Sequence, residues 1–188
     1  MNTLTKLGLM ISLLCGTPLA RASDIAPRAT DPTAAELKPS DSVQIRNKQF
    51  GDLLRPEDAN HADGTPIVLY PAQPWKCMTW KLLAAGDTTF CLRNHFTSKT
   101  IAPAPASEGT NQPVRQIALP QNVAEQPAWI FTRLPDGSYK IANAKSGEAL
   151  TAVPNARGGS PRIVIAPWQN RDAQKWEVRK IDPRTLTM

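Results

Sequence analysis

The ionisable and nucleophilic side chains of this 188-residue chain show none of the spacings typical of enzymes or metal sites. His61 and His95 are its two histidines, and they stand too far apart in the sequence to form a metal-ligand pattern. We expect both to be solvated loop residues. The sequence has no Ser/His/Asp arrangement, glycine-rich phosphate loop or H-E-x-x-H motif, and no pair of carboxylates is singled out for glycoside hydrolysis. These features favour a protein that is not an enzyme and uses no cofactor or metal ion.

The side chains best suited to binding are aromatic residues that stand next to two prolines. Tyr70 directly precedes Pro71, Trp75 follows four residues after that proline, and Trp168 directly follows Pro167. The segments around both tryptophans are expected to be loops, where binding residues are often found, and a large ring can anchor a ligand. The alternative role for Trp75 and Trp168 is to shield the core.

A threefold repeat supplies the elements that would position these residues. Three alternating apolar segments, residues 43–47, 90–94 and 139–143, each end in Asn, a pattern typical of a half-buried strand that runs into a turn. An aliphatic residue stands seven positions after each Asn, an apolar triplet followed by Pro comes later, and a Trp stands nine positions after each Pro. The equivalent residues, 47 or 49 positions apart, are Asn47, Asn94 and Asn143; Leu54, Ile101 and Leu150; Pro71, Pro120 and Pro167; Trp80, Trp129 and Trp176.

This repeated spacing predicts an all-β fold of three similar units, each with about four short strands. One such unit cannot bury its apolar face alone, so the three must pack around a common core. We expect Trp80, Trp129 and Trp176 to form that core, because each ring buries on the order of 150–250 Å². The three asparagines are expected to make turn hydrogen bonds.

Residues 137–150 and 174–178 resemble the ricin B-type β-trefoil lectin domain. The Gln-x-Trp hallmark of that family is intact in the third repeat as Gln174-Lys175-Trp176, whereas Met78-Thr79-Trp80 and Pro127-Ala128-Trp129 keep only the tryptophan. The resemblance covers roughly residues 42–181 and implies an all-β β-trefoil. Its repeats would span about 42–86, 87–136 and 137–181, followed by a tail at 182–188.

The resemblance also implies where a ligand would bind. Sugar-binding members use an acidic residue near the start of a repeat, an aromatic ring that stacks on the sugar, and a polar pair that includes the Gln of Gln-x-Trp. The acidic position falls near Arg55, Ala102 and Thr151, and the aromatic position falls on Tyr70, Leu119 and Ala166, so no repeat is complete. The candidate carbohydrate-binding residues are therefore Tyr70, Trp75, Trp168 and Gln174. The alternative role for Gln174 is to tie loop backbone together.

Two functions follow as hypotheses from the resemblance. The first is a non-catalytic, lectin-like protein that recognises a cell-surface glycan or glycoprotein. The alternative is an accessory or receptor-binding subunit of a bacterial toxin, by analogy with cytolethal distending toxin accessory subunits, which would have a catalytic partner chain. A third hypothesis, a β-trefoil hydrolase inhibitor, has no supporting feature beyond residues 102–113, which we expect to form a long surface loop.

The N-terminus is typical of a cleavable export signal. Lys6 precedes an apolar stretch at residues 7–16, and an A-x-A site at 20–22 predicts a signal peptide over residues 1–22 with cleavage after Ala22. The protein is then secreted or periplasmic. Residues 23–41 are rich in proline and alanine without periodicity, and we expect a disordered lead-in there. No second apolar stretch is long enough to span a bilayer, so we do not expect a transmembrane protein.

Cleavage would leave Cys77 and Cys91 as an even pair in an exported protein, for which a disulfide is the default expectation. Two free buried thiols are the alternative. Cleavage also removes Lys6 and Arg21, which lowers the net charge from +6 to +4. The remaining basic residues are scattered, which argues against nucleic acid as a partner and leaves a mild attraction to anionic glycans.

Overall fold

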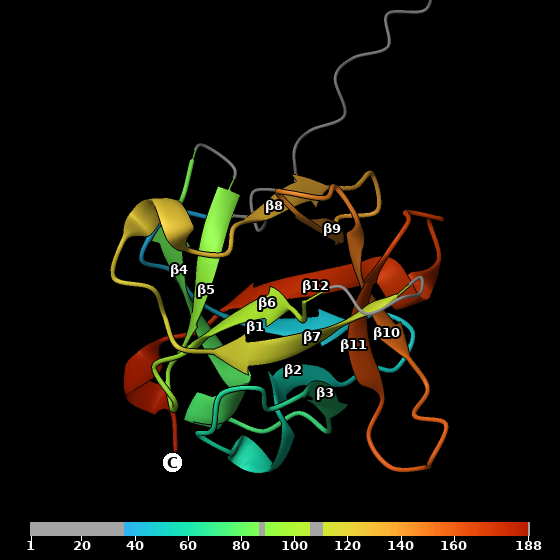
Figure 1. The fold of residues 1–188 in the computed structure, drawn as a ribbon, viewed down its shortest axis with the longest axis horizontal. Helices are drawn as coiled ribbons and strands as arrows, with labels where there is room; N and C mark the ends of the chain where they lie inside the picture. The colour runs from blue at the N-terminus through green and yellow to red at the C-terminus, as the bar shows by residue number, and fades with distance from the viewer. Residues whose placement is uncertain (1–35, 87–88, 106–110, 188) are drawn as a thin grey trace, which may run out of the picture. The chain divides into compact units, whose positions relative to one another are not determined.

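Twelve β-strands and five 3-10 turns make up the regular structure of the residues that our computed structural model describes, which are 36–86, 89–105 and 111–187 (Figure 1). These residues all belong to one unit, Ala34–Met188. The strands are β1 Ser42–Asn47, β2 Leu53–Pro56, β3 Ile67–Tyr70, β4 Thr79–Ala84, β5 Thr89–Asn94, β6 Thr100–Pro103, β7 Gln112–Ile117, β8 Trp129–Arg133, β9 Tyr139–Asn143, β10 Ala149–Val153, β11 Arg162–Ala166 and β12 Lys175–Lys180. The 3-10 turns are η1 Glu57–Ala59, η2 Lys76–Met78, η3 Val123–Glu125, η4 Asp172–Gln174 and η5 Pro183–Thr185.

Six of the strands close into a barrel, two from each repeat. Strand β1 pairs with β4, β4 with β5, β5 with β8, β8 with β9, β9 with β12, and β12 with β1, all antiparallel. A closed ring of this kind leaves no open strand edge within the barrel. Each repeat thus contributes its first and fourth strands to the barrel.

The other six strands form three hairpins that contact one another. They are β2–β3, β6–β7 and β10–β11, one in each repeat. Strand β11 pairs with both β3 and β7, and a bridge joins Pro66 to Arg115. A six-stranded barrel with three mutually paired hairpins is the β-trefoil, so the predicted fold class is confirmed, with four strands in each repeat.

The tryptophans that recur once in each repeat occupy equivalent positions in the core. We call these residues the register tryptophans: Trp80, Trp129 and Trp176. Their indole Nε1 atoms each donate to the carbonyl of the aliphatic residue that stands seven positions after the repeat's Asn, and none of the three rings is exposed to solvent. The bonds run from Trp80 to Leu54 at 3.0 Å, from Trp129 to Ile101 at 3.3 Å, and from Trp176 to Leu150 at 3.0 Å. Each ring therefore ties a barrel strand to the hairpin of its own repeat.

The asparagines that end the first strands hold the turns that follow. In each repeat the side-chain Oδ1 accepts from the backbone N–H groups two and three residues later, at 3.0–3.3 Å. In two repeats the amide also donates to a carbonyl near the Gln-x-Trp position: Asn47 to Ala173 at 3.0 Å and Asn94 to Cys77 at 2.9 Å. These bonds fix the start of each hairpin relative to the preceding barrel strand.

The segments that flank the trefoil are more closely attached than the sequence predicts. Leu37 packs against the core, and the Ser40 N–H donates to the Leu82 carbonyl at 2.7 Å, so residues 36–41 of the expected disordered lead-in are docked on the barrel. At the other end, Thr187 pairs with Trp75 in a parallel bridge. The expected signal peptide, 1–22, and residues 23–35 lie outside the described residues.

The prediction of a Cys77–Cys91 disulfide is wrong, because both residues are free, buried thiols. Cys77 lies in η2, under Asn94, which donates to its carbonyl at 2.9 Å. Cys91 lies on β5, and its Sγ is 3.3 Å from Thr100 Oγ1.

Part of the expected 102–113 loop is also strand. Ala102 and Pro103 belong to β6 and pair with Arg115 and Val114 of β7. No helix among the described residues has the length and apolar character needed to cross a membrane.

Candidate functional site

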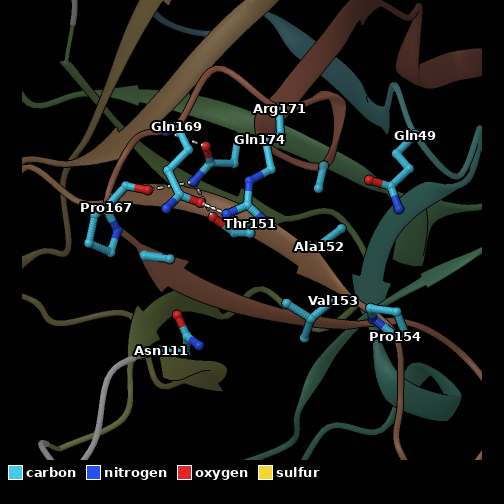
Figure 2. A pocket seen from close by; sticks show the side chains of 12 residues that line it. Gln49, Asn111, Thr151, Ala152, Val153, Pro154, Pro167, Gln169, Arg171 and Gln174 are labelled. Atoms are coloured by element: carbon cyan, nitrogen blue, oxygen red, sulfur yellow. Dashed lines mark hydrogen bonds between the residues drawn. The ribbon is translucent and has the colours of Figure 1, made fainter.

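A hollow of about 470 Å³ lies beside the β10–β11 hairpin of the third repeat, and residues from all three repeats line it (Figure 2). Gln49 of the first repeat and Asn111 of the second join a third-repeat lining made by β10, β11 and the loop that leads into η4. We call this hollow the third-repeat pocket. Its lining residues are Gln49, Asn111, Thr151, Ala152, Val153, Pro154, Ala166, Pro167, Gln169, Arg171, Ala173 and Gln174.

Gln174 forms the back of the third-repeat pocket and has its hydrogen bonds met within the protein. Its Oε1 accepts from the Gln169 N–H at 2.7 Å, and its Nε2 donates to Thr151 Oγ1 at 3.1 Å and to the Pro167 carbonyl at 2.8 Å. Figure 2 shows these three partners gathered around its amide. Only 2% of Gln174 is exposed, so its role here is to tie the 167–169 loop to β10.

The rim of the third-repeat pocket carries the polar side chains that a ligand would meet. Gln169, Arg171, Asn111 and Gln49 are all exposed, and the Arg171 guanidinium donates to Gln169 Oε1. Together they offer amide donors and acceptors and one fixed positive charge above an apolar lining of valine, alanine and proline. A concave site with a few convergent polar groups over apolar surface is the usual form of a small-molecule site.

The third-repeat pocket lacks two groups that the resemblance associates with sugar binding. Thr151 and Ala166 occupy the expected acidic and aromatic positions, on the same face of the β10–β11 hairpin. The Thr151 hydroxyl is engaged with the Ala149 carbonyl at 2.8 Å and with Gln174. Any sugar bound there would be held by the rim and by apolar contact, without a carboxylate or a stacking ring from this hairpin.

The equivalent position in the first repeat is occupied by an arginine and a tyrosine that contact each other. Arg55 and Tyr70 are diagonal neighbours on the β2–β3 hairpin, and the Arg55 Cζ lies 3.8 Å from the centre of the tyrosine ring. Arg55 is only 8% exposed, and the Asp58 carboxylate lies 3.9 Å from its Nη2. Because the guanidinium already stacks on the ring, Tyr70 presents less free surface for a sugar than the resemblance implies.

Trp75 extends this first-repeat aromatic cluster toward the C-terminus. Its ring stacks on Tyr70 with centroids 6.1 Å apart, and both rings pack against a small buried cluster of Leu53, Cys77 and Met78. The backbone on either side of Trp75 is bound to Thr187, whose N–H donates to the Pro74 carbonyl at 2.8 Å and whose carbonyl accepts from Lys76 at 3.1 Å. The structure thus brings Tyr70 and Trp75 together and also gives both of them packing partners.

Trp168 lies apart from the other predicted binding residues. It is half-buried, and Lys140 Nζ of β9 lies 5.4 Å from the centre of its ring. It follows Pro167, which lines the third-repeat pocket, but its own ring is not among the lining groups. The four candidates therefore divide into a pair in the first repeat, Gln174 behind the third-repeat pocket, and Trp168 beside Lys140.

The rim residues Gln169 and Arg171 were not predicted from the sequence. Their one available signal is position: they lie two and four residues after the third register proline, in the loop that the Gln174 amide holds. Among the described residues, no group of three His, Cys, Asp or Glu side chains is placed to bind a metal ion. The side chains that line the third-repeat pocket offer hydrogen bonding, a positive charge and apolar contact.

Comparisons with known proteins agree with this fold. Residues 125–188 match the family of ricin-type β-trefoil lectin domain-like proteins, and no curated protein sequence matches significantly. The solved structure of the designed threefold-symmetric protein ThreeFoil is similar at 23% identity and a TM-score of 0.65, covering 73% of this chain and 96% of that one.

Two natural proteins are similar at lower sequence identity. The Rhizoctonia solani agglutinin has 16% identity and a TM-score of 0.65, covering 78% of this chain and 99% of its own. A chain of the cytolethal distending toxin from Actinobacillus actinomycetemcomitans has 15% identity and a TM-score of 0.58, covering 75% and 92%. The predicted resemblance is confirmed: the protein is a β-trefoil whose C-terminal segment matches the ricin-type lectin domain-like family.

Proposed function

We propose that this protein is a non-catalytic, lectin-like β-trefoil that binds carbohydrate in the third-repeat pocket. The single observation that carries the proposal is the hollow itself, where Gln49, Asn111, Gln169 and Arg171 surround an apolar floor. Sugars offer hydroxyl groups that both donate and accept hydrogen bonds, together with apolar ring faces, and this lining is complementary to both. The similarity to lectins supports the proposal at the level of the fold.

The Arg171 guanidinium favours a saccharide with an acceptor-rich group at the rim. It is exposed and shares its Nη2 donor with Gln169, so its remaining N–H groups are free to face a ligand. Gln174 contributes indirectly, since its three bonds hold the loop that carries Gln169.

A glycan array tests this proposal. The protein should bind a defined subset of glycans, and the double variant Gln169→Ala/Arg171→Ala should lose that binding while keeping its thermal unfolding midpoint. The matched control is Gln73→Ala/Arg133→Ala, which removes one exposed amide and one exposed arginine elsewhere, Gln73 being the first-repeat counterpart of Gln169. An array on which the wild-type protein binds nothing, or on which both double variants bind alike, would refute the proposal.

A second candidate function is that of an accessory subunit of a bacterial toxin complex. The similarity to a cytolethal distending toxin chain favours this candidate. Phe96, at 38% exposure, and Val123, at 62%, are the exposed large apolar residues of the described part of the chain where a partner could make apolar contact. Co-purification from the native host separates the two functions. A toxin subunit should bring a catalytic chain with it, and a lectin acting alone should not.

We further propose that the protein is exported after cleavage behind Ala22. The apolar stretch at 7–16 and the A-x-A at 20–22 support this. Mass spectrometry of protein from the periplasm or medium should give an N-terminus at Ser23; an intact Met1 in those fractions would contradict it.

A further inference from the structure

A second, smaller hollow lies on the β4–β5 strand pair, away from the third-repeat lining residues. Its volume is about 240 Å³, and it is lined by Lys81, Arg93, Asn94, His95 and Ser98. Strands β4 and β5 run side by side in Figure 1. Residues 81 and 93 form the pair next to the Trp80–Asn94 end of this pairing. The two charged lining groups of this β4–β5 hollow are both cationic.

The two cations face each other directly across the strands. Lys81 and Arg93 are register partners in the antiparallel β4–β5 pair, where like charges are destabilising. Neither takes part in any ion pair among the described residues, although seven such pairs exist there. Within the described part of the chain, the fold therefore keeps two positive charges without an ion-pair partner side by side in the lining of a hollow.

His95 adds a third basic group and was expected from the sequence to be a solvated loop residue. It is instead half-buried, and its Nε2 lies 2.9 Å from Ser42 Oγ of β1. Burial first, and then the nearby charges of Lys81, Arg93 and Lys76, lower the pKa of His95. No carboxylate is among the groups that shift this pKa.

The other lining side chains leave mainly donors facing the hollow. The Asn94 amide is already engaged, since its Nδ2 donates to Cys77 and its Oδ1 accepts from Phe96 and Thr97. Ser98 is exposed at the edge of the hollow and can offer its hydroxyl. An ammonium, a guanidinium and a hydroxyl together are the donors that bind tetrahedral oxyanions.

We propose that the β4–β5 hollow is a binding site for a sulfate or phosphate group. Lys81 and Arg93 would neutralise the anion and bind its oxygens, and an anion placed between them would remove their mutual repulsion. The site is independent of the third-repeat pocket, because the two share no lining residue. The same chemistry could come from a free inorganic ion or from a sulfated sugar, and the test separates these sources.

The direct test is a titration with sodium sulfate at constant ionic strength, followed by backbone amide shifts in NMR. We expect saturable shifts centred on residues 81, 93–95 and 98, and at least a tenfold weaker dissociation constant for Lys81→Gln/Arg93→Gln. The matched control is Lys145→Gln/Arg157→Gln, which removes the same charge from two exposed residues in the third repeat. Absence of saturable shifts, or equal weakening in both double variants, would overturn the proposal.

The source of the anion is decided by comparing sulfate, glucose 6-sulfate and glucose. Tenfold tighter binding of glucose 6-sulfate than of sulfate identifies a sugar-borne group, whereas equal affinities identify a free ion; both outcomes support an oxyanion site. Shifts of the same amides by unsubstituted glucose would overturn it. A glycan array that fails for the third-repeat variants leaves this result unaffected, so the two proposals can fail separately.

The pH dependence of sulfate affinity gives an independent readout. The charged groups that act on His95 are Lys76 in η2, Lys81 in β4 and Arg93 in β5. Among the lining residues, His95 carries the side chain whose type ordinarily gains a proton just below neutral pH, and sulfate keeps its charge there. Sulfate should therefore bind more tightly as the pH falls through the lowered pKa of His95, and His95→Gln should flatten this dependence. An affinity independent of pH in the wild-type protein, or the same slope in His95→Gln, would count against the assigned site.

Discussion

Each of the three register tryptophans acts on two parts of its repeat at once. The ring fills the core, and the indole N–H donates to a hairpin carbonyl of the same repeat. A buried carbonyl left unpaired costs about 1–3 kcal/mol. The near-constant spacing between the aliphatic residue and the tryptophan, which recurs in all three repeats of the sequence, therefore has a hydrogen-bonding cause as well as a packing cause.

Trp80→Phe, Trp129→Phe and Trp176→Phe should each lower the free energy of unfolding by about 2 kcal/mol, because the carbonyl loses its donor and a small cavity opens. The effect of Trp129→Phe should be the smallest, since its bond to Ile101 is 3.3 Å and the other two are 3.0 Å. Urea denaturation measures this series. A series in which Trp129→Phe is the most damaging would contradict the role given to these bonds.

Cys77 and Cys91 should resist alkylation in the native protein and react in the unfolded protein without prior reduction. Both thiols are buried, and burial raises the pKa of each, although Arg55 opposes the effect at Cys77 and Thr100 opposes it at Cys91. Peptide mapping after iodoacetamide treatment in denaturant checks this. If the two cysteines are modified only after a reductant is added, they form the disulfide that the sequence suggested.

At the scale of elements, the barrel strands do more than enclose the core. Strands β4 and β5 place Lys81 opposite Arg93, a pairing that weakens the sheet by a few tenths of a kcal/mol or more. A cost of this kind in a barrel strand fits a binding role better than a purely structural one.

Arg93→Glu should raise the free energy of unfolding by about 0.2–1 kcal/mol, because it replaces a like-charge cross-strand pair with an opposite-charge pair. Arg93→Gln, which only removes the repulsion, should give a smaller gain. Thermal or urea unfolding at low ionic strength measures both. A loss of stability in Arg93→Glu would show that Arg93 makes a favourable contact within the protein.

The C-terminal tail, which the sequence analysis set off only by its bounds of 182–188, is attached to the first repeat. Deleting residues 182–188 should cost about 1–3 kcal/mol, because two backbone hydrogen bonds between Thr187 and the Pro74–Lys76 segment are lost. Hydrogen exchange at residues 74–76 should accelerate. The control Thr187→Ala keeps both backbone bonds and should change little; equal effects of the deletion and of Thr187→Ala would contradict this explanation.

At the scale of the whole molecule, the sequence predicted what repeats and little of what differs between repeats. Asn, Pro and Trp recur at equivalent positions because each of the three repeats needs the same hydrogen bonds in its turn, the same end to its third strand and the same ring in the core. Within the third repeat, Gln174 was recognised from its motif, and its structural alternative matches the three bonds that it makes.

The rest of the site depends on contacts between segments that are distant in the sequence. Gln49 and Asn111 reach the third-repeat pocket only because the trefoil brings its three repeats together. Likewise, Arg55 covers Tyr70 because a diagonal pairing in β2–β3 places the two side chains on one face. The even pair of cysteines suggested a disulfide, whereas in the structure both thiols are free and buried.

The measurement that tests the central claim most directly is calorimetric titration of the best glycan from the array into three proteins. The wild-type protein, Gln169→Ala/Arg171→Ala and Trp75→Ala together compare the third-repeat pocket with the first-repeat aromatic cluster. We predict at least tenfold weaker binding for Gln169→Ala/Arg171→Ala and an unchanged dissociation constant for Trp75→Ala. The reverse pattern, with affinity lost in Trp75→Ala and kept in the pocket variant, would contradict the account.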